Sequence, residues 1–237
     1  DSTGLNLVGD ASIAENALRL TSDTYQTSAA WYSAPQLSSV DFTTTFDFRV
    51  TDSSGGFVFV IQNERPDSLG GPGSNIGYSG IANSLAVEFD CRWNNDAFAQ
   101  DPSGSHVSVH TLGVAPNSAN EAFSLGWVST DTLSPGFMLS DGQVHTATIS
   151  YDAGAETLTI DLDATAALEV TVDLADTLAL HQGRAWVGFT STSGGLPSHH
   201  DILNWQFTSP SETTPVITID DVEQAEATDG TSVDVVF

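Results

Sequence analysis

The chain has 237 residues with 31 acidic and five basic side chains, which gives a formal net charge of −26. A nucleic-acid-binding protein presents a basic footprint to phosphates, so this charge excludes nucleic acid as a partner and argues equally against an anionic membrane surface. No apolar run approaches the ~20 residues that cross a bilayer, so we expect no membrane insertion.

Apolar residues alternate with polar ones along most of the chain, which is the period of a half-buried β-strand. In chain order, this pattern predicts strands at residues 42–50, 57–62, 106–110, 145–151 and 158–163. Turns rich in Gly, Ser and Asp separate them. Many strands with long polar loops in more than 200 residues predict an all-β fold, a two-sheet antiparallel β-sandwich. We expect Trp31, Trp186 and Trp205 to fill its core.

The composition changes near the end of the chain and predicts a domain boundary there. Residues 1–208 form the main predicted domain, and residues 209–215 are a linker by their Ser, Thr and Pro content. Residues 216–237 begin a new β pattern that resembles the opening strands of a Calx-beta repeat. The resemblance implies a piece of a longer modular surface protein, with other domains of the same chain as partners.

One stretch, LAVEFDCRWNNDAFAQDPSGSH, carries most of the chemistry of the chain. It begins as an apolar strand that places Glu88 and Asp90 two residues apart, on one face of that strand. A polar loop with Asn94 and Asp101 follows, and His106 opens the next strand. Carboxylate, amide and carbonyl oxygens are ligands for Ca²⁺, whereas carboxylates with one imidazole suit Mn²⁺ or a similar ion. The stretch therefore predicts two adjacent ions bridged by Asp90 and Asp101.

These motifs resemble, in their order, those of L-type (legume-type) lectins. The family's metal loop has a V-E-F-D strand, an aromatic residue, an Asn, an Asp-Pro pair and a His, and this chain has VEFD, Asp101-Pro102 and His106. Further matching segments are FTTTFDFRV with GGFVFVIQN, DGQVHTATISYDAGAETLTIDLD, AWVGFTSTSGG and HHDILNWQF. The matches run from about Leu5 to Phe207, and the glycine-rich loop SLGGPGSNIGYSGIANS resembles bacterial more than plant members. The resemblance implies a concanavalin A-like jelly roll that binds carbohydrate and is not an enzyme.

The resemblance also implies the metal ligands. Glu88, Asp90, Asp101 and His106 would hold a transition ion such as Mn²⁺, while Asp90, Asp101, the Asn94 side chain and the Arg92 carbonyl would hold Ca²⁺. Two registers of the loop are open. Without a gap, Arg92 and Asn94 take the family's aromatic and Asn positions; with one extra residue, Trp93 and Asn95 take them. We prefer the gapless register because it needs no bulge.

The implied sugar pocket lies beside Ca²⁺ and departs from the family at one position. The family's Asp before G-x-A-F accepts two sugar hydroxyls, and this chain has Gly55 there. Such charge-assisted bonds are worth about 1.5–3 kcal/mol each. Asp52 is an alternative acceptor three residues earlier.

Other sugar-binding candidates come from the remaining loops of the implied pocket. They are Asn94, Ser74, Gly195 and Leu196, together with Trp93, which either stacks on the sugar or packs in the core. The tandem His199-His200 matches the family's structural His-Asp pair, His200-Asp201, better than a zinc site.

Three functions compete. The first is a calcium-dependent lectin module of a secreted or cell-surface protein, such as an adhesin, that binds a glycan. The second is a metal-stabilised spacer that has lost sugar binding, which Gly55 favours. The third is a glycoside hydrolase, which requires a second glutamate after Glu88-Phe89-Asp90; the chain has Cys91, Arg92 and Trp93 there instead. We prefer the first, with an extracellular or cell-surface location.

Overall fold

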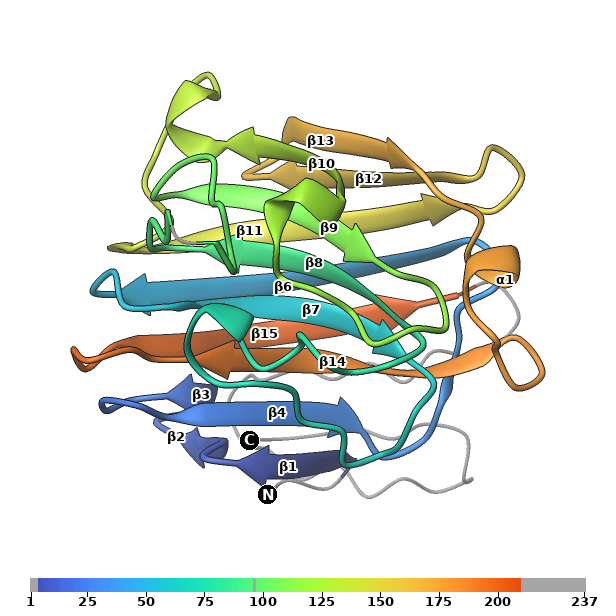
Figure 1. The fold of residues 1–237 in the computed structure, drawn as a ribbon, viewed down its shortest axis with the longest axis horizontal. Helices are drawn as coiled ribbons and strands as arrows, with labels where there is room; N and C mark the ends of the chain where they lie inside the picture. Colours follow the sequence, from blue (N-terminus) through green and yellow to red (C-terminus); the bar gives the residue numbers. More distant parts are fainter. Residues whose placement is uncertain (1–3, 96, 210–237) are drawn as a thin grey trace.

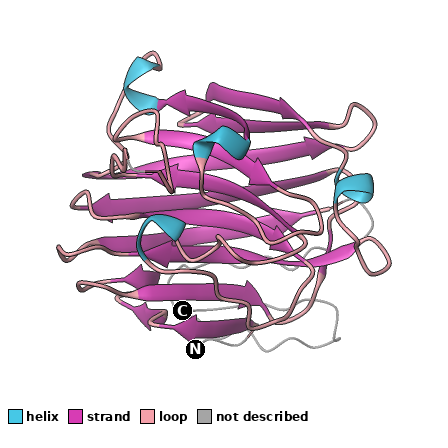
Figure 2. Cartoon of the chain, viewed as in Figure 1, coloured by secondary structure: helices cyan, strands magenta, loops and turns pink. Residues whose placement is uncertain are grey.

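The computed structural model describes residues 4–95 and 97–209, and these residues form two antiparallel sheets packed face to face (Figures 1 and 2). The strands are β1 Leu5–Gly9, β2 Ser12–Ala14, β3 Ala17–Thr21, β4 Thr27–Tyr32, β5 Gln36–Leu37, β6 Phe42–Thr51, β7 Gly56–Gln62, β8 Ser84–Asp90, β9 His106–Thr111, β10 Ser124–Ser129, β11 Asp141–Asp152, β12 Thr157–Leu162, β13 Thr165–Thr171, β14 Arg184–Thr192 and β15 His199–Thr208. The short helices are η1 Gly73–Asn75, η2 Glu121–Phe123, η3 Thr130–Thr132 and α1 Leu174–Thr177. None of these described helices is long and apolar enough to cross a membrane.

The two sheets confirm the predicted sandwich. In the described residues the front sheet has eight strands, with seven in the order β1-β4-β14-β7-β8-β9-β10 and β5 paired to β14. The back sheet has seven strands, in the order β13-β12-β11-β6-β15-β3-β2. The predicted Calx-beta-like strands at 216–237, and all but the first residue of the predicted linker, lie outside the described residues.

Aromatic side chains fill the space between the sheets. Phe57 and Phe89, on neighbouring strands of the front sheet, stack with their ring centroids 4.7 Å apart. Phe46 on β6 contacts both from the back sheet, with centroids 6.2 and 5.7 Å away. Trp205 is fully buried in this core, and its indole N–H donates to the Thr44 hydroxyl at 2.9 Å. Large aromatic areas removed from water supply much of the stabilisation of such a core.

A second apolar core lies on the other face of the front sheet. It contains Trp31 with Val58 and Val60, while Trp186 packs against it partly buried. The Trp31 N–H donates to the Ser68 carbonyl at 2.9 Å, which ties a long loop over this face. The prediction that Trp31 and Trp186 fill the sandwich core is therefore wrong. Alternation places them on the outer face, and that face is buried as well.

His200 and Asp201 do not bond to each other but to separate partners. The His200 ring accepts or donates hydrogen bonds with the hydroxyls of Thr21 and Ser191, each at 2.8 Å. The Asp201 carboxylate instead accepts from the Arg19 guanidinium at 2.8 and 3.0 Å. Neighbouring strand residues face opposite sides of a sheet, so the pair is structural through different contacts.

Candidate functional site

Four predicted metal ligands converge where β8 ends and β9 begins. Asp90 and His106 face each other directly in the antiparallel pairing of these strands, and Glu88 lies two residues back on the same face as Asp90. Asp101 arrives from the metal loop, residues 91–105. One ligand atom each from Asp90, Asp101 and His106 lies within 4.8 Å of the others, and all three residues are buried.

Hydrogen bonds within the metal loop orient the two aspartates. The Arg92 backbone N–H donates to the Asp90 carboxylate at 2.6 Å, and the Asn94 N–H donates to the Asp101 carboxylate. The Asp101 N–H in turn donates to the Asn94 carbonyl at 3.2 Å. The indole N–H of Trp93 donates to the Asp101 carbonyl at 3.1 Å. The loop thus closes on itself and holds both carboxylates close to His106.

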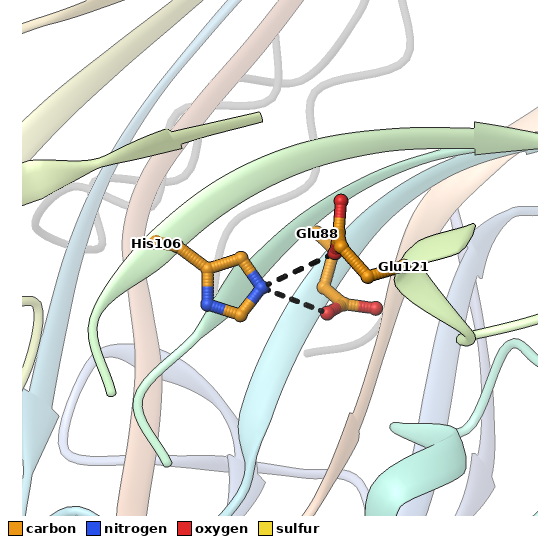
Figure 3. Close-up of side chains that lie close together, drawn as sticks. All are labelled: Glu88, His106 and Glu121. Carbon is orange, nitrogen blue, oxygen red and sulfur yellow. Dashed lines mark ion pairs between the residues drawn. The ribbon is translucent and has the colours of Figure 1, made fainter. Parts of the chain in front are cut away.

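The structure adds a carboxylate that the sequence did not predict. Glu121 lies in η2, between β9 and β10, and its carboxylate is 3.6 Å from His106 Nε2. Glu88 lies 3.7 Å from the same nitrogen, so His106 points at two carboxylates (Figure 3). His110 Nε2 is also 3.6 Å from Glu121. The H-x-S-x-H pattern of β9 signals a polar face, but no spacing in the sequence links it to Glu121.

Burial acts on the acidic members of this cluster. It raises the pKa values of the Glu88 and Asp90 carboxyls above their usual range, because the charged form loses its hydration. Burial likewise raises the pKa of Asp101 to about 6. These three carboxylates therefore need positive charge close by.

His106 and Glu121 each shift the pKa of the other. Burial opposes the charged form of His106, but the carboxylates of Glu121, Asp90 and Glu88 outweigh it and raise the pKa of the imidazole to about 9. Burial also opposes the charge on Glu121, yet its contact with His106 contributes to lowering its pKa to about 2. The cluster thus stabilises positive charge at its centre.

The cluster fits a divalent transition ion. Glu88 Oε2, His106 Nε2 and both carboxylate oxygens of Glu121 are buried and have no hydrogen-bond partner among the described residues. Buried polar groups left unpaired are costly, and an ion between them would satisfy them together. Carboxylates with imidazole suit Mn²⁺ and similar ions, while the oxygen-rich side of the loop suits Ca²⁺.

A small cavity of about 160 Å³ adjoins the metal loop. It contains the predicted positions Gly55, Ser74, Asn94 and Gly195, but not Trp93 or Leu196. The complete lining is Gly55, Gly73, Ser74, Ile76, Asp90, Arg92, Asn94, Thr192, Gly194 and Gly195. Four separate loops therefore meet here. A larger cavity of about 640 Å³, lined by Phe42, Tyr151 and Glu169 among others, lies on the back sheet and includes none of the predicted site residues.

Gly55 is required by the backbone at the edge of this cavity. Its φ is +92°, and a Cβ there would lie 2.0 Å from the Thr192 carbonyl oxygen. Asp52 does not line the cavity; its side chain is exposed, and its carbonyl accepts from the Ser198 hydroxyl at 2.7 Å. The described cavity therefore has no carboxylate at the family's Asp position.

Three exposed aromatic or apolar side chains belong to residues that adjoin the cavity lining in sequence or contact it. Trp93 is 61% exposed, so core packing is excluded for it, and Leu196 is 60% exposed. Tyr25, which the sequence did not single out, is 81% exposed, and its backbone N–H donates to the Gly194 carbonyl at 2.8 Å. These three side chains are available to a ligand that extends beyond the cavity.

Comparisons with known proteins agree with this geometry. The profile of the legume lectin β-barrel domain matches residues 2–205. A seed lectin of Styphnolobium japonicum is 31% identical over 194 residues, covering 73% of this chain and 58% of that protein. A probable L-type lectin-domain containing receptor kinase of Arabidopsis thaliana is 28% identical over 211 residues, covering 77% of this chain and 28% of that protein. The chain thus spans less than two thirds of these relatives. The winged bean acidic lectin, solved with methyl-α-D-galactose, superposes with a TM-score of 0.68 at 26% identity, covering 87% of this chain and 92% of that one.

Proposed function

This chain belongs to the legume lectin family, and from that membership we propose that it is a calcium-dependent carbohydrate-binding domain. The observation that carries the proposal is the cavity in which Asp90 and Asn94 meet Gly55, Ser74 and Gly195 from three other loops. A shallow site with a few convergent polar groups beside an ordered ion suits one monosaccharide unit. The partner is a glycan, free or on a cell surface.

Two ions would order the loop that forms one wall of the cavity. We assign the transition ion, such as Mn²⁺, to Glu88, Asp90, Asp101 and His106. We assign Ca²⁺ to Asp90, Asp101, the Asn94 side chain and the Arg92 carbonyl. The gapless register is supported by the lining of the cavity, which contains Arg92 and Asn94 but neither Trp93 nor Asn95. The ions neutralise converging carboxylates, so that the loop is ordered before sugar arrives.

Sugar binding would rest on the Asn94 amide and on polar groups of the Ser74 and Gly195 loops. Because Gly55 supplies no carboxylate, two charge-assisted bonds worth about 1.5–3 kcal/mol each are missing. We therefore expect a dissociation constant for a free monosaccharide in roughly the millimolar range, about −4 kcal/mol. Trp93 and Leu196 would contribute apolar contact with neighbouring sugar units.

A secreted or cell-surface modular protein, such as an adhesin, is the setting that we propose. The Arabidopsis relative carries its lectin domain in a receptor kinase, which supports a surface role. The net charge of −26 supports a role away from nucleic acid and anionic membranes.

The test is binding of the Ca²⁺- and Mn²⁺-loaded domain, displayed multivalently, to a broad glycan array that includes galactosides. Multivalent display is needed because weak single sites gain avidity of about 10²–10⁴. Binding that disappears with EDTA supports the proposal. An array without signal at high multivalent concentration contradicts it and leaves a metal-stabilised spacer.

Two neighbouring asparagines give a matched pair of variants. Asn94→Ala should abolish both sugar binding and Ca²⁺ binding, whereas Asn95→Ala should leave both unchanged. The opposite result would favour the register with one extra loop residue. Trp93→Ala should weaken binding, and Trp127→Ala, at a 48% exposed tryptophan of β10, is its control.

A further inference from the structure

We propose that Glu121 is a further protein ligand of the transition ion, beside Glu88, Asp90, Asp101 and His106. The inference rests on the proposed function in one respect, that an ion occupies this site. It adds a residue from η2, a separate segment between β9 and β10.

The distances favour an ion between these groups over a direct ion pair. His106 Nε2 is 3.6 Å from Glu121 Oε2 and 3.7 Å from Glu88 Oε1. A direct charge-assisted hydrogen bond would measure about 2.7–2.9 Å. Two ligand atoms bound to one first-row ion at about 2.0–2.2 Å, with ordinary angles between them, lie roughly 3.0–3.6 Å apart. The Glu121 separation of 3.6 Å lies at the upper end of this range and the Glu88 separation of 3.7 Å lies just above it, while both are far longer than a direct hydrogen bond.

The unpaired atoms also point to an ion. His106 is fully buried, the side chains of Glu88 and Glu121 are 2% and 8% exposed, and Figure 3 shows all three directed at one point. Both Glu121 oxygens, Glu88 Oε2 and His106 Nε2 have no hydrogen-bond partner among the described residues. Their convergence would be costly without a cation to bind them.

The charges balance when Glu121 is included. Glu88, Asp90 and Asp101 bring three negative charges to two divalent ions, and Glu121 brings the fourth. Four carboxylates and two divalent cations form a neutral buried unit, which avoids the cost of leaving net charge in a medium of low dielectric constant.

The anchoring of Glu121 gives the additional ligand a mechanical role. Its backbone N–H donates to the Ala99 carbonyl at 2.8 Å, and the Asn120 amide donates to the Ala97 carbonyl at 3.1 Å. An ion held by Glu121 would therefore tie η2 and the metal loop to β8 and β9 at once. Loss of Glu121 should weaken ion binding and loosen the loop together.

The experiment titrates metal-stripped protein with Mn²⁺ in saturating Ca²⁺, by calorimetry and by the electron paramagnetic resonance signal of free Mn²⁺. Glu121→Gln should raise the dissociation constant at least about tenfold, the scale of well-placed groups at metal sites. Glu156→Gln, which removes the same charge at an exposed position, should leave it unchanged. Unchanged Mn²⁺ affinity in Glu121→Gln would overturn this inference alone. Absence of Mn²⁺ binding by the unaltered protein would overturn the inference together with the proposed transition-ion site.

A second readout does not depend on a variant that folds. In crystals grown with Mn²⁺, anomalous difference density should place the ion within about 2.3 Å of a Glu121 oxygen, allowing for ordinary bond lengths. A water molecule between the ion and Glu121 would overturn the inference. If Glu121→Gln does not fold, Glu121→Asp keeps the charge on a shorter side chain and should still weaken Mn²⁺ binding.

Discussion

A side chain introduced at Gly55 should destabilise the protein and should not restore the family's sugar-binding carboxylate. Gly55 has φ +92°, and a Cβ there would meet the Thr192 carbonyl oxygen at 2.0 Å and its carbon at 2.9 Å. Gly80 is a matched control, because its φ is +99° but nothing lies within 4 Å of its Cβ position.

Comparing the two glycines separates the free-energy cost of positive φ from the cost of the steric clash at Gly55. Positive φ costs a non-glycine residue about 1–2 kcal/mol at either position. Ordinary C···O contacts measure about 3.3–3.6 Å, so an added Cβ at Gly55 must force β14 away from the turn before β7. Overpacking of this kind costs about 1–3 kcal/mol more, so we expect about 2–5 kcal/mol for Gly55→Ala and about 1–2 kcal/mol for Gly80→Ala.

The assay is urea unfolding of the metal-loaded variants, with Gly55→Asp included. Equal free energies of unfolding for Gly55→Ala and Gly80→Ala would refute the steric argument. A Gly55→Asp variant that folds normally and binds sugar more tightly than the unaltered protein would refute it as well.

Three further predictions concern the ions, a buried histidine and the core. Chelation with EDTA should lower the melting temperature by roughly 5–10 °C, because an ion at 100 times its dissociation constant contributes about 2.7 kcal/mol; an unchanged melt would contradict an occupied site. Burial lowers the pKa of His200 from 6.5 to about 3, so the fold has its full stability above pH 6.5 and loses the contribution of neutral His200 as the pH falls toward 3. His200→Gln should therefore make the melting temperature depend less on pH between 6.5 and 3. Parallel curves of melting temperature against pH for the variant and the unaltered protein would refute this. Phe57→Ala should cost about 3–5 kcal/mol in urea unfolding, against less than about 0.5 kcal/mol for Val114→Ala, at a residue that is 63% exposed. Similar losses for the two would contradict the assignment of Phe57 to the core.

The strands were predictable because their alternation has a direct physical cause. A strand such as β6, with Phe46 and Phe48 buried and polar residues between them, can satisfy its pattern only in a sheet. The jelly roll followed from motif order, and family membership confirms it. Two expectations stay predictions: the closer resemblance of the glycine-rich loop to bacterial members of the family, and the Calx-beta-like strands at residues 216–237.

Other features could not be predicted from the sequence, because they depend on contacts between segments that are distant along the chain. Glu121 reaches His106 only because η2 packs on the metal loop through contacts between distant segments. Trp31 and Trp186 were misplaced because alternation distinguishes two faces of a strand but does not say which one faces the partner sheet. The steric need for Gly55 was also hidden, since the atom that forbids a side chain belongs to Thr192, far along the sequence.

The second core, on the outer face of the front sheet, makes the molecule three layers deep at the proposed site. Trp31, Val58 and Val60 hold the covering loops through contacts that the inner phenylalanines do not share. We therefore expect the covering layer to open as a separate cooperative unit while the sandwich stays folded. Hydrogen exchange after metal removal should accelerate first in the loops over Trp31 and leave β6 and β15 protected. In such an arrangement the proposed sugar binding depends on the covering loops, while the stability of the fold depends on the two sheets. The loops can then diverge in sequence without unfolding the sandwich.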